Sequence, residues 1–167
     1  MSGLNQFVRG SSDENLIKAL GMEEQKHTGP YTLATCHAVV FANNMKHIHF
    51  HIQGKKFDTV HNITGEYYDK ASEDADYLAE LGMEKGQNIP NFCQAAQLVP
   101  AIVATSAVYS YETAIADIAV YLGTYVSALQ NLRNVIPDED IQSKLDDMIR
   151  YWNKELNYKN KQRFGQE

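Results

Sequence analysis

Four residues between positions 49 and 80 have the types and spacing of a transition-metal site. His49 precedes Gly54 by five residues, and His61 follows that glycine by seven. If helices run into and out of a turn at Gly54, they pair antiparallel, so both imidazoles lie at similar depth and face each other. Asp76 and Glu80 are four residues apart, which places both carboxylates on one helix face. Two imidazoles with two carboxylates suit iron, manganese or zinc better than calcium or magnesium.

The separation of the two pairs argues against one site within one chain. His61 and Asp76 are fifteen residues apart, which on a continuous helix is ~22 Å at about 1.5 Å of rise per residue. One ion cannot bridge that distance. Either the pairs act separately, or a two-fold axis brings the histidines of one subunit to the acids of another and creates two equivalent sites. The sequence therefore points to an intersubunit metal site.

The same residues resemble a family signature. Residues 49–61 read H-F-H-I-Q-G-K-K-F-D-T-V-H, which is similar to the signature H-W-x-V-x-G-x-x-F-x-x-x-H of the Dps family (DNA-binding protein from starved cells), the mini-ferritins of the ferritin-like superfamily. Residues 76–80, D-Y-L-A-E, resemble the D-x-x-A-E of that family, and a looser likeness extends over residues 31–163. The signature positions are held by His49, Gly54, Phe57, His61, Asp76, Ala79 and Glu80.

Three residues depart from the family pattern. Phe50 stands where the family usually has tryptophan, Gly65 where it usually has an aspartate ligand, and Leu81 where an arginine commonly follows the glutamate. Position 65 lies one helical turn after His61 on the same face, so glycine there removes an oxygen ligand. Asp58, three residues before His61, reaches toward the same region without matching geometry and is the weakest candidate ligand. We therefore expect one firmly held iron per site and a weak second metal.

The resemblance implies an activity and an assembly. It implies a ferroxidase that oxidises Fe(II), preferentially with hydrogen peroxide, and stores ferric mineral inside a hollow homododecamer whose two-fold interfaces share the metal sites. Zn²⁺ is a substitute for iron in such a ligand set. The alternatives are a non-catalytic ferritin-fold assembly with a degenerate site and an oligomer stabilised by structural zinc. The implied ligands are His49, His61, Asp76 and Glu80.

The apolar pattern predicts the elements that would position these residues. The 3.6-residue period and the breaks at glycine and proline predict an all-α, ferritin-like up-down four-helix bundle, with a long crossover carrying a short helix between its second and third helices. Three parts are expected: a lead-in with one short helix over residues 1–30, the bundle over 31–163 and a tail over 164–167. The expected helices of the bundle span residues 31–53, 55–85, 92–98, 101–135 and the segment after Asp138.

Other histidines and both cysteines favour structural roles. His47 and His51 have the i,i+4 spacing of a chelate, but they lie roughly opposite His49 on a helical wheel, so a surface or packing role is expected. Residues 24–27 match the E-x-x-H of larger ferritins only once, and no histidine follows position 61, so a di-iron site in the bundle core is not expected. Cys36 and Cys93 are expected to be buried free thiols.

Composition limits the partners. One domain accounts for 167 residues, and no apolar run reaches the length of a membrane span. No secretory signal is visible, so a cytoplasmic protein is expected. The net charge of −6 argues against a generic nucleic-acid binder, and we expect weak or no DNA binding at physiological salt. The cations that could give weak, multivalent association are Lys154, Lys159, Lys161 and Arg163.

Overall fold

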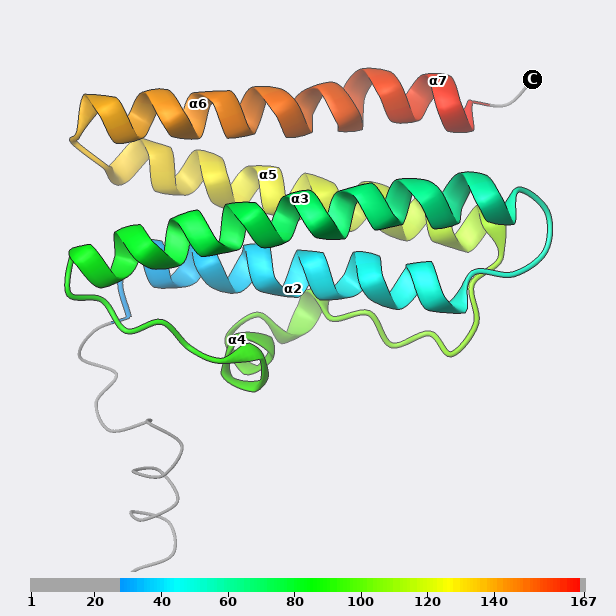
Figure 1. Ribbon diagram of the computed structural model, residues 1–167, viewed down its shortest axis with the longest axis horizontal. Coiled ribbons are helices and arrows are strands. Elements are labelled where there is room, and N and C mark those ends of the chain that lie inside the picture. The colour runs from blue at the N-terminus through cyan, green and yellow to red at the C-terminus, as the bar shows by residue number, and fades with distance from the viewer. Residues whose placement is uncertain (1–27, 166–167) are drawn as a thin grey trace, which may run out of the picture.

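Four long helices make up most of the protein. A computed structural model describes residues 28–165, and its long helices are α2 (Pro30–His51), α3 (Phe57–Glu84), α5 (Tyr111–Val135) and α6 (Glu139–Lys154). A π-helical turn, η3 (Glu155–Lys159), continues α6 into α7 (Asn160–Phe164). The crossover between α3 and α5 carries α4 (Phe92–Leu98) and a 3-10 turn, η2 (Pro100–Ile102). The predicted all-α, up-down four-helix bundle with a short helix in its crossover is confirmed (Figure 1).

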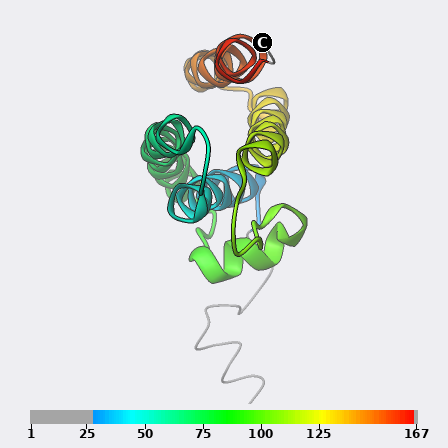
Figure 2. The same ribbon diagram turned by 90° about the vertical axis from the view of Figure 1, so that its right-hand side faces the viewer.

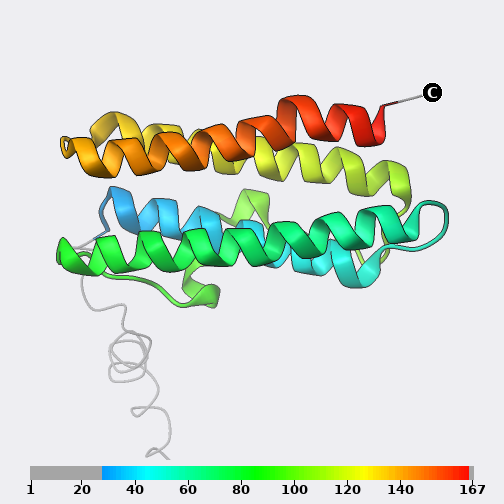
Figure 3. The ribbon, with the colours of Figure 1, turned by 45° about the horizontal axis from the view of Figure 1, so that its top comes forward.

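The bundle is built from two helical hairpins. Seen end-on, α2 and α3 form one hairpin, α5 and α6 form the other, and α4 lies outside the bundle against α2 (Figure 2). Figure 3 shows α7 extending the line of α6 along the full length of the bundle. No helix within residues 28–165 is long and apolar enough to cross a membrane. The lead-in helix predicted within residues 1–30 and the end of the predicted tail lie outside the described residues, so the division into three parts stays a prediction.

The turn between α2 and α3 forms as Gly54 predicted. Gly54 has φ of 86° and Lys56 has φ of 59°, both in the left-handed region, where glycine is favoured. Two such residues within three positions end any helix, so α3 begins at Phe57 rather than at position 55. α2 ends at His51 rather than at position 53, because the Gln53 amide donates to the carbonyl of Tyr109 (3.0 Å) instead of to its own helix.

The prediction that the third long helix starts directly after Pro100 is wrong. The segment before Tyr111 runs extended along α2, where the Asn44 side chain accepts from the Ala104 amide (2.9 Å) and donates to the Ile102 carbonyl. The helix then begins at a cap, because the Ser110 hydroxyl accepts from the Thr113 amide. Asn44 thus holds residues 102–104 against α2 and outside a helix.

Apolar residues spaced along one face of each long helix form most of the core. Cys36 is fully buried between α2 and α4, and its burial raises the pKa of the thiol to about 11, as expected for an inert cysteine. Cys93 is exposed, so its predicted burial is wrong: the short α4 meets α2 through Ala95, and its other face is open to solvent. Ile115, expected in the core, is only half-buried. The predicted core residues that are buried on α5 and α6 include Ile118, Leu122, Val126, Leu129, Leu132, Ile141, Leu145, Met148 and Trp152.

Two carboxylates that the sequence did not mark lie inside the bundle. Asp74 on α3 is 3% exposed and Glu155 in η3 is 2% exposed. Glu155 accepts hydrogen bonds from the Tyr67 hydroxyl (3.0 Å) and from Arg163 (2.8 Å), and it also pairs with Lys159. Burial alone would raise the pKa of Glu155, but these hydrogen bonds outweigh it and hold the pKa below the ordinary value. The π-helical turn thus begins with a charged, buried glutamate that accepts several hydrogen bonds.

The substitution Glu155→Gln should destabilise the protein in a pH-dependent way. At neutral pH we expect a loss of roughly 1–3 kcal/mol of unfolding free energy, because Tyr67 and Arg163 lose a charged acceptor, with partial exposure of the cations favouring the lower end. The folded-state pKa is depressed, so the stabilisation is complete above the unfolded-state pKa and disappears as pH falls through the folded-state pKa. Urea unfolding of variant and wild type should therefore converge in acid.

The matched control for this test is Asp147→Asn. Asp147 forms an exposed ion pair with Arg150, which should contribute little at any pH. A stability gap between Glu155→Gln and wild type that is the same at neutral and acid pH would contradict the charged role of Glu155.

Candidate metal centre

The two candidate histidines meet across the α2–α3 hairpin. His49 lies in the last turn of α2, and His61 lies in the second turn of α3. Their ring centroids are 3.6 Å apart with an angle of 21° between the ring planes, so the imidazoles are stacked. The turn at Gly54 therefore places both rings at the same depth, as the spacing predicted.

Crossed hydrogen bonds fix the protonation pattern of both rings. His49 Nδ1 lies 2.7 Å from the carbonyl oxygen of His61, and His61 Nδ1 lies 2.9 Å from the carbonyl oxygen of His49. A carbonyl only accepts, so in the neutral imidazoles each Nδ1 carries the proton and each Nε2 keeps its lone pair. A backbone carbonyl on Nδ1 is the usual partner that orients a metal-binding imidazole. Both Nε2 atoms have the electronic state that a divalent metal requires.

The His49 carbonyl used in one of these bonds is available for a structural reason. The last turn of a helix leaves carbonyl oxygens without an intrahelical donor, and the amide of Gln53, which would serve His49, bonds to Tyr109 instead. His61 supplies the missing donor. The bond that orients this ring therefore also caps the end of α2.

Aromatic side chains surround the imidazole pair. Phe57 stacks on His61 with centroids 4.8 Å apart, and Tyr68 meets His49 edge-on at 5.4 Å. Phe50 contacts His49 from the other side (5.4 Å) and is 65% exposed, while Phe57 is 40% exposed. The half-buried histidines thus sit in an exposed aromatic surface, which is the composition of a protein–protein contact.

The two acids lie far from the histidines within the chain. Asp76 and Glu80 are both exposed on α3, and α3 is unbroken from Phe57 to Glu84. The rise from His61 to Asp76 is therefore ~22 Å at about 1.5 Å per residue. Across residues 28–165, three or more histidine, cysteine, aspartate or glutamate side chains nowhere come together in a way that could hold a metal. The structure unites the histidines and leaves the acids apart from them.

Gly65 faces the imidazole pair. A Cβ atom built at this position would lie 3.4 Å from His49 Cε1 and 3.5 Å from its Nδ1. The position therefore points at the histidines, as one helical turn from His61 predicted, and it has room for a side chain with little adjustment. Asp58 is exposed in the first turn of α3, with no described contact to either imidazole.

His47 and His51 hold the crossover against α2 and do not join the His49–His61 pair. Their rings lie 4.2 Å apart, His51 Nδ1 donates to the His47 carbonyl (2.8 Å), and His47 Nε2 donates to the Ser106 carbonyl (2.7 Å). His47 also meets the buried Tyr109 ring edge-on. The pair attaches the crossover to α2, which agrees with the packing role that the helical wheel predicted. The E-x-x-H of residues 24–27 lies outside the described residues.

Sequence reasoning missed the features that depend on backbone atoms and on long-range contacts. The crossed histidine bonds use carbonyl groups, which carry no residue-type signal. The pairing of Tyr68 with His49 had only a weak signal, since position 68 follows His61 by two helical turns on the same face. The two carbonyl groups and the Tyr68 ring all contact the imidazoles directly and hold their orientation.

Comparison with known proteins identifies the fold. No protein-family model and no curated protein matches the chain. Among solved structures, antigen TpF1 from Treponema pallidum aligns with a TM-score of 0.72 at 17% identity, covering 82% of this chain and 92% of that one. A Dps protein from Bacillus brevis aligns with a TM-score of 0.65 at 23% identity, covering 76% of this chain and 87% of that one. Dps from Staphylococcus aureus aligns with a TM-score of 0.65 at 17% identity, covering 80% of this chain and 89% of that one. The chain has the ferritin-like four-helix fold of the Dps proteins.

Proposed function

We propose that the protein is a Dps-like ferroxidase and iron store whose active sites form between subunits. Two histidines of one subunit and two acids of a two-fold-related copy bind Fe(II) as substrate, hydrogen peroxide oxidises it, and ferric mineral collects inside a hollow dodecamer. The observation that carries the proposal is the crossed hydrogen bonding of His49 and His61, which leaves both Nε2 atoms free to bind a metal. The fold shared with Dps proteins supports the same assembly.

The residues of the chain account for the affinity and for the direction of the reaction. Neutral Nε2 atoms of His49 and His61 are suitable ligands for Fe(II). The carboxylates of Asp76 and Glu80 offset the additional positive charge of Fe(III), so they bind the product more strongly than the substrate. Burial of the aromatic surface around the histidines by a second copy would exclude water and strengthen these interactions.

Gly65 sets the number of irons that each site holds firmly. Without a carboxylate at this position, one iron is held firmly by His49 and the two acids, and His61 directs a weak second metal or a water. The second ferric ion would lack an anionic ligand, so paired oxidation of two irons should be slow.

The absence of a carboxylate at position 65 also supports a second candidate function. A site that has lost one oxygen ligand is also what a non-catalytic ferritin-fold assembly would have, with zinc held between subunits for stability. Two imidazoles and two carboxylates satisfy the four-coordinate geometry of structural zinc. In that case zinc would raise the thermal stability of the oligomer, and Fe(II) with peroxide would produce no mineral.

We further propose a cytoplasmic protein with weak or no DNA binding at physiological salt. Of the four C-terminal cations, Lys159 and Arg163 are bonded to Glu155, so they are poorly placed to contact phosphate. Lys154 and Lys161 are exposed and remain the candidates for weak, salt-sensitive association.

Complementation between variants should reveal the shared site. His49→Ala with His61→Ala in one chain, or Asp76→Ala with Glu80→Ala, should each abolish rapid Fe(II) oxidation by peroxide. When the two chains are coexpressed in equal amounts, half of the two-fold interfaces are mixed and each has one intact site, so about a quarter of wild-type activity should return. The measurement is the initial rate of ferric absorbance growth in purified oligomers.

The control coexpresses the histidine-deficient chain with a chain that carries all four substitutions. This mixture has no intact site and should stay inactive. An inactive mixture of the two complementary chains, with oligomers of normal size, would reject the intersubunit site.

Gly65→Asp should add a metal. Anaerobic titration of the wild type is expected to show about one tightly bound Fe(II) per subunit, and the variant should approach about two, because a carboxylate beside His49 supplies the missing oxygen ligand. Gly65→Ala is the matched control, since it adds the same Cβ without a ligand and should leave the stoichiometry unchanged. Two equally tight irons per subunit in the wild type would refute this account of Gly65.

A further inference from the structure

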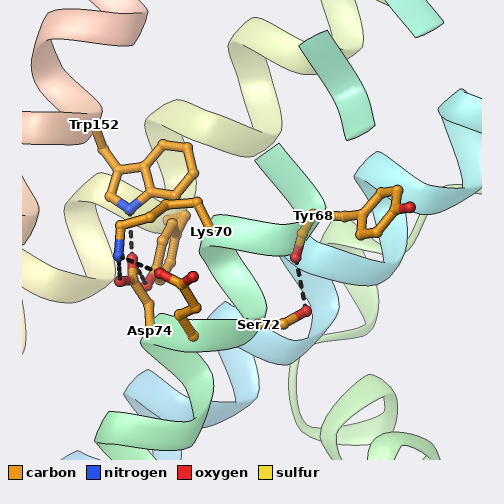
Figure 4. Close-up of polar contacts among 7 residues, drawn as sticks. Tyr68, Lys70, Ser72, Asp74 and Trp152 are labelled. Atoms are coloured by element: carbon orange, nitrogen blue, oxygen red, sulfur yellow. Dashed lines mark hydrogen bonds and ion pairs between the residues drawn. The ribbon is translucent and has the colours of Figure 1, made fainter. Parts of the chain in front are cut away.

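A buried cluster on the inner face of α3 has no part in the site described above. Asp74 accepts hydrogen bonds from Trp152 Nε1 (2.6 Å), from the Tyr125 hydroxyl (3.2 Å) and from Lys70 Nζ (2.8 Å). Trp152 and Tyr125 are fully buried, and Trp152 is the only tryptophan of the chain. Figure 4 shows Trp152 and Lys70 both directed at Asp74, with Tyr68 on the opposite side of α3.

The composition of this cluster is unusual for a hydrophobic core. Burying a carboxylate is unfavourable unless all its bonds are made, and an apolar residue of similar volume is often at least as stable. Here the donors to Asp74 include the two side-chain types that lose an electron most readily, indole and phenol. Tyr67 repeats the arrangement, since its hydroxyl donates to the buried Glu155. Trp152 and Tyr125 thus each have a carboxylate positioned to accept a proton, while the Tyr67 hydroxyl lies between Glu155 (3.0 Å) and Asn160 Oδ1 (2.7 Å).

Aromatic contacts connect the cluster to the histidine pair. The Trp152 ring meets the Tyr67 ring edge-on with centroids 5.5 Å apart. Tyr67 is followed in the chain by Tyr68, whose ring contacts His49 at 5.4 Å. One backbone link therefore separates two short ring-to-ring steps between Trp152 and the imidazoles. The path crosses α3 from its core face to its site face.

We propose that Trp152 is a one-electron donor to the His49–His61 site, with Asp74 as the acceptor of its indole proton. This inference rests on the proposed function. Hydrogen peroxide takes up two electrons, and a site that holds one iron firmly supplies only one of them. Trp152 provides the second electron, in place of the second iron that Gly65 leaves weakly bound.

Fe(II) and Trp152 supply the two electrons that hydrogen peroxide takes up. Fe(II) loses one electron and becomes Fe(III), while the indole of Trp152 loses one electron and passes its Nε1 proton to Asp74, leaving a neutral tryptophanyl radical. Peroxide accepts both electrons and two solvent protons, its O–O bond breaks, and two waters form, so no hydroxyl radical is released. The next Fe(II) to reach the site returns an electron to the indole, and Asp74 returns the proton.

The test is freeze-quench electron paramagnetic resonance on the full oligomer. Anaerobic protein with about one Fe(II) per subunit is mixed with less peroxide than iron. A radical is expected within the oxidation phase, and ring-deuterated tryptophan should narrow its hyperfine pattern, which assigns it to Trp152 because the chain has one tryptophan. Iron oxidised per peroxide should be near one while the radical signal is at its maximum, and it should rise to two as further Fe(II) reduces the radical. In Trp152→Phe the ratio should be near two without this early phase.

One variant tests the role of Asp74 as proton acceptor, and a second variant is its control. Asp74→Asn keeps the shape but removes the proton acceptor, so the radical should form more slowly and in lower yield. Tyr151→Phe is the control: Tyr151 touches Trp152 (4.9 Å) but has no described bond to a carboxylate, so the signal should be unchanged.

The outcomes distinguish this inference from the proposed function. Iron that is oxidised without a tryptophan signal in the wild type overturns the role of Trp152 and leaves the ferroxidase intact. A signal of undiminished rate and yield in Asp74→Asn overturns the role of Asp74. If no iron is oxidised, the proposed function fails, and this inference fails with it.

Discussion

The crossed hydrogen bonds between His49 and His61 are the interaction on which the site depends. They join the last turn of α2 to the second turn of α3, and so they fix the register of the hairpin. The same bonds set the tautomer of both rings, because a carbonyl acceptor holds the proton on Nδ1. One pair of contacts therefore caps a helix, closes a hairpin and leaves the Nε2 atoms of both neutral rings without a proton.

The unbroken course of α3 explains why the candidate histidines and acids of one chain are far apart. A single unbroken helix from Phe57 to Glu84 has His61 near one end and Asp76 and Glu80 near the other, too far apart for one ion. Antiparallel pairing of two such helices about a two-fold axis would bring each half-site to its complement. The opposite face of the same helix carries Asp74 in the core, so α3 lies between the imidazole pair and the buried Trp152.

Helix type and position were predictable from the sequence where local rules dominate. Gly54 predicted the turn, the last helix begins after Asp138, which is a typical N-cap residue and caps it, and the 3.6-residue period of the apolar residues matches the buried side of α6. Long-range contacts were not predictable. Asn44 holds residues 102–104 outside a helix, and the burial of Asp74 depends on Trp152 and Tyr125, which lie 78 and 51 residues away. Cys93 was misplaced because a seven-residue helix can cover only one face.

The shared site can be tested most directly by locating the iron. Crystals of the oligomer soaked anaerobically with Fe(II) and measured on both sides of the iron absorption edge would show each iron as an anomalous peak. The account predicts peaks at the two-fold interface, within bonding distance of His49 Nε2 of one subunit and of the carboxylates of Asp76 and Glu80 of the other. Iron bound only at His47 and His51, or held by residues of a single subunit, would contradict it.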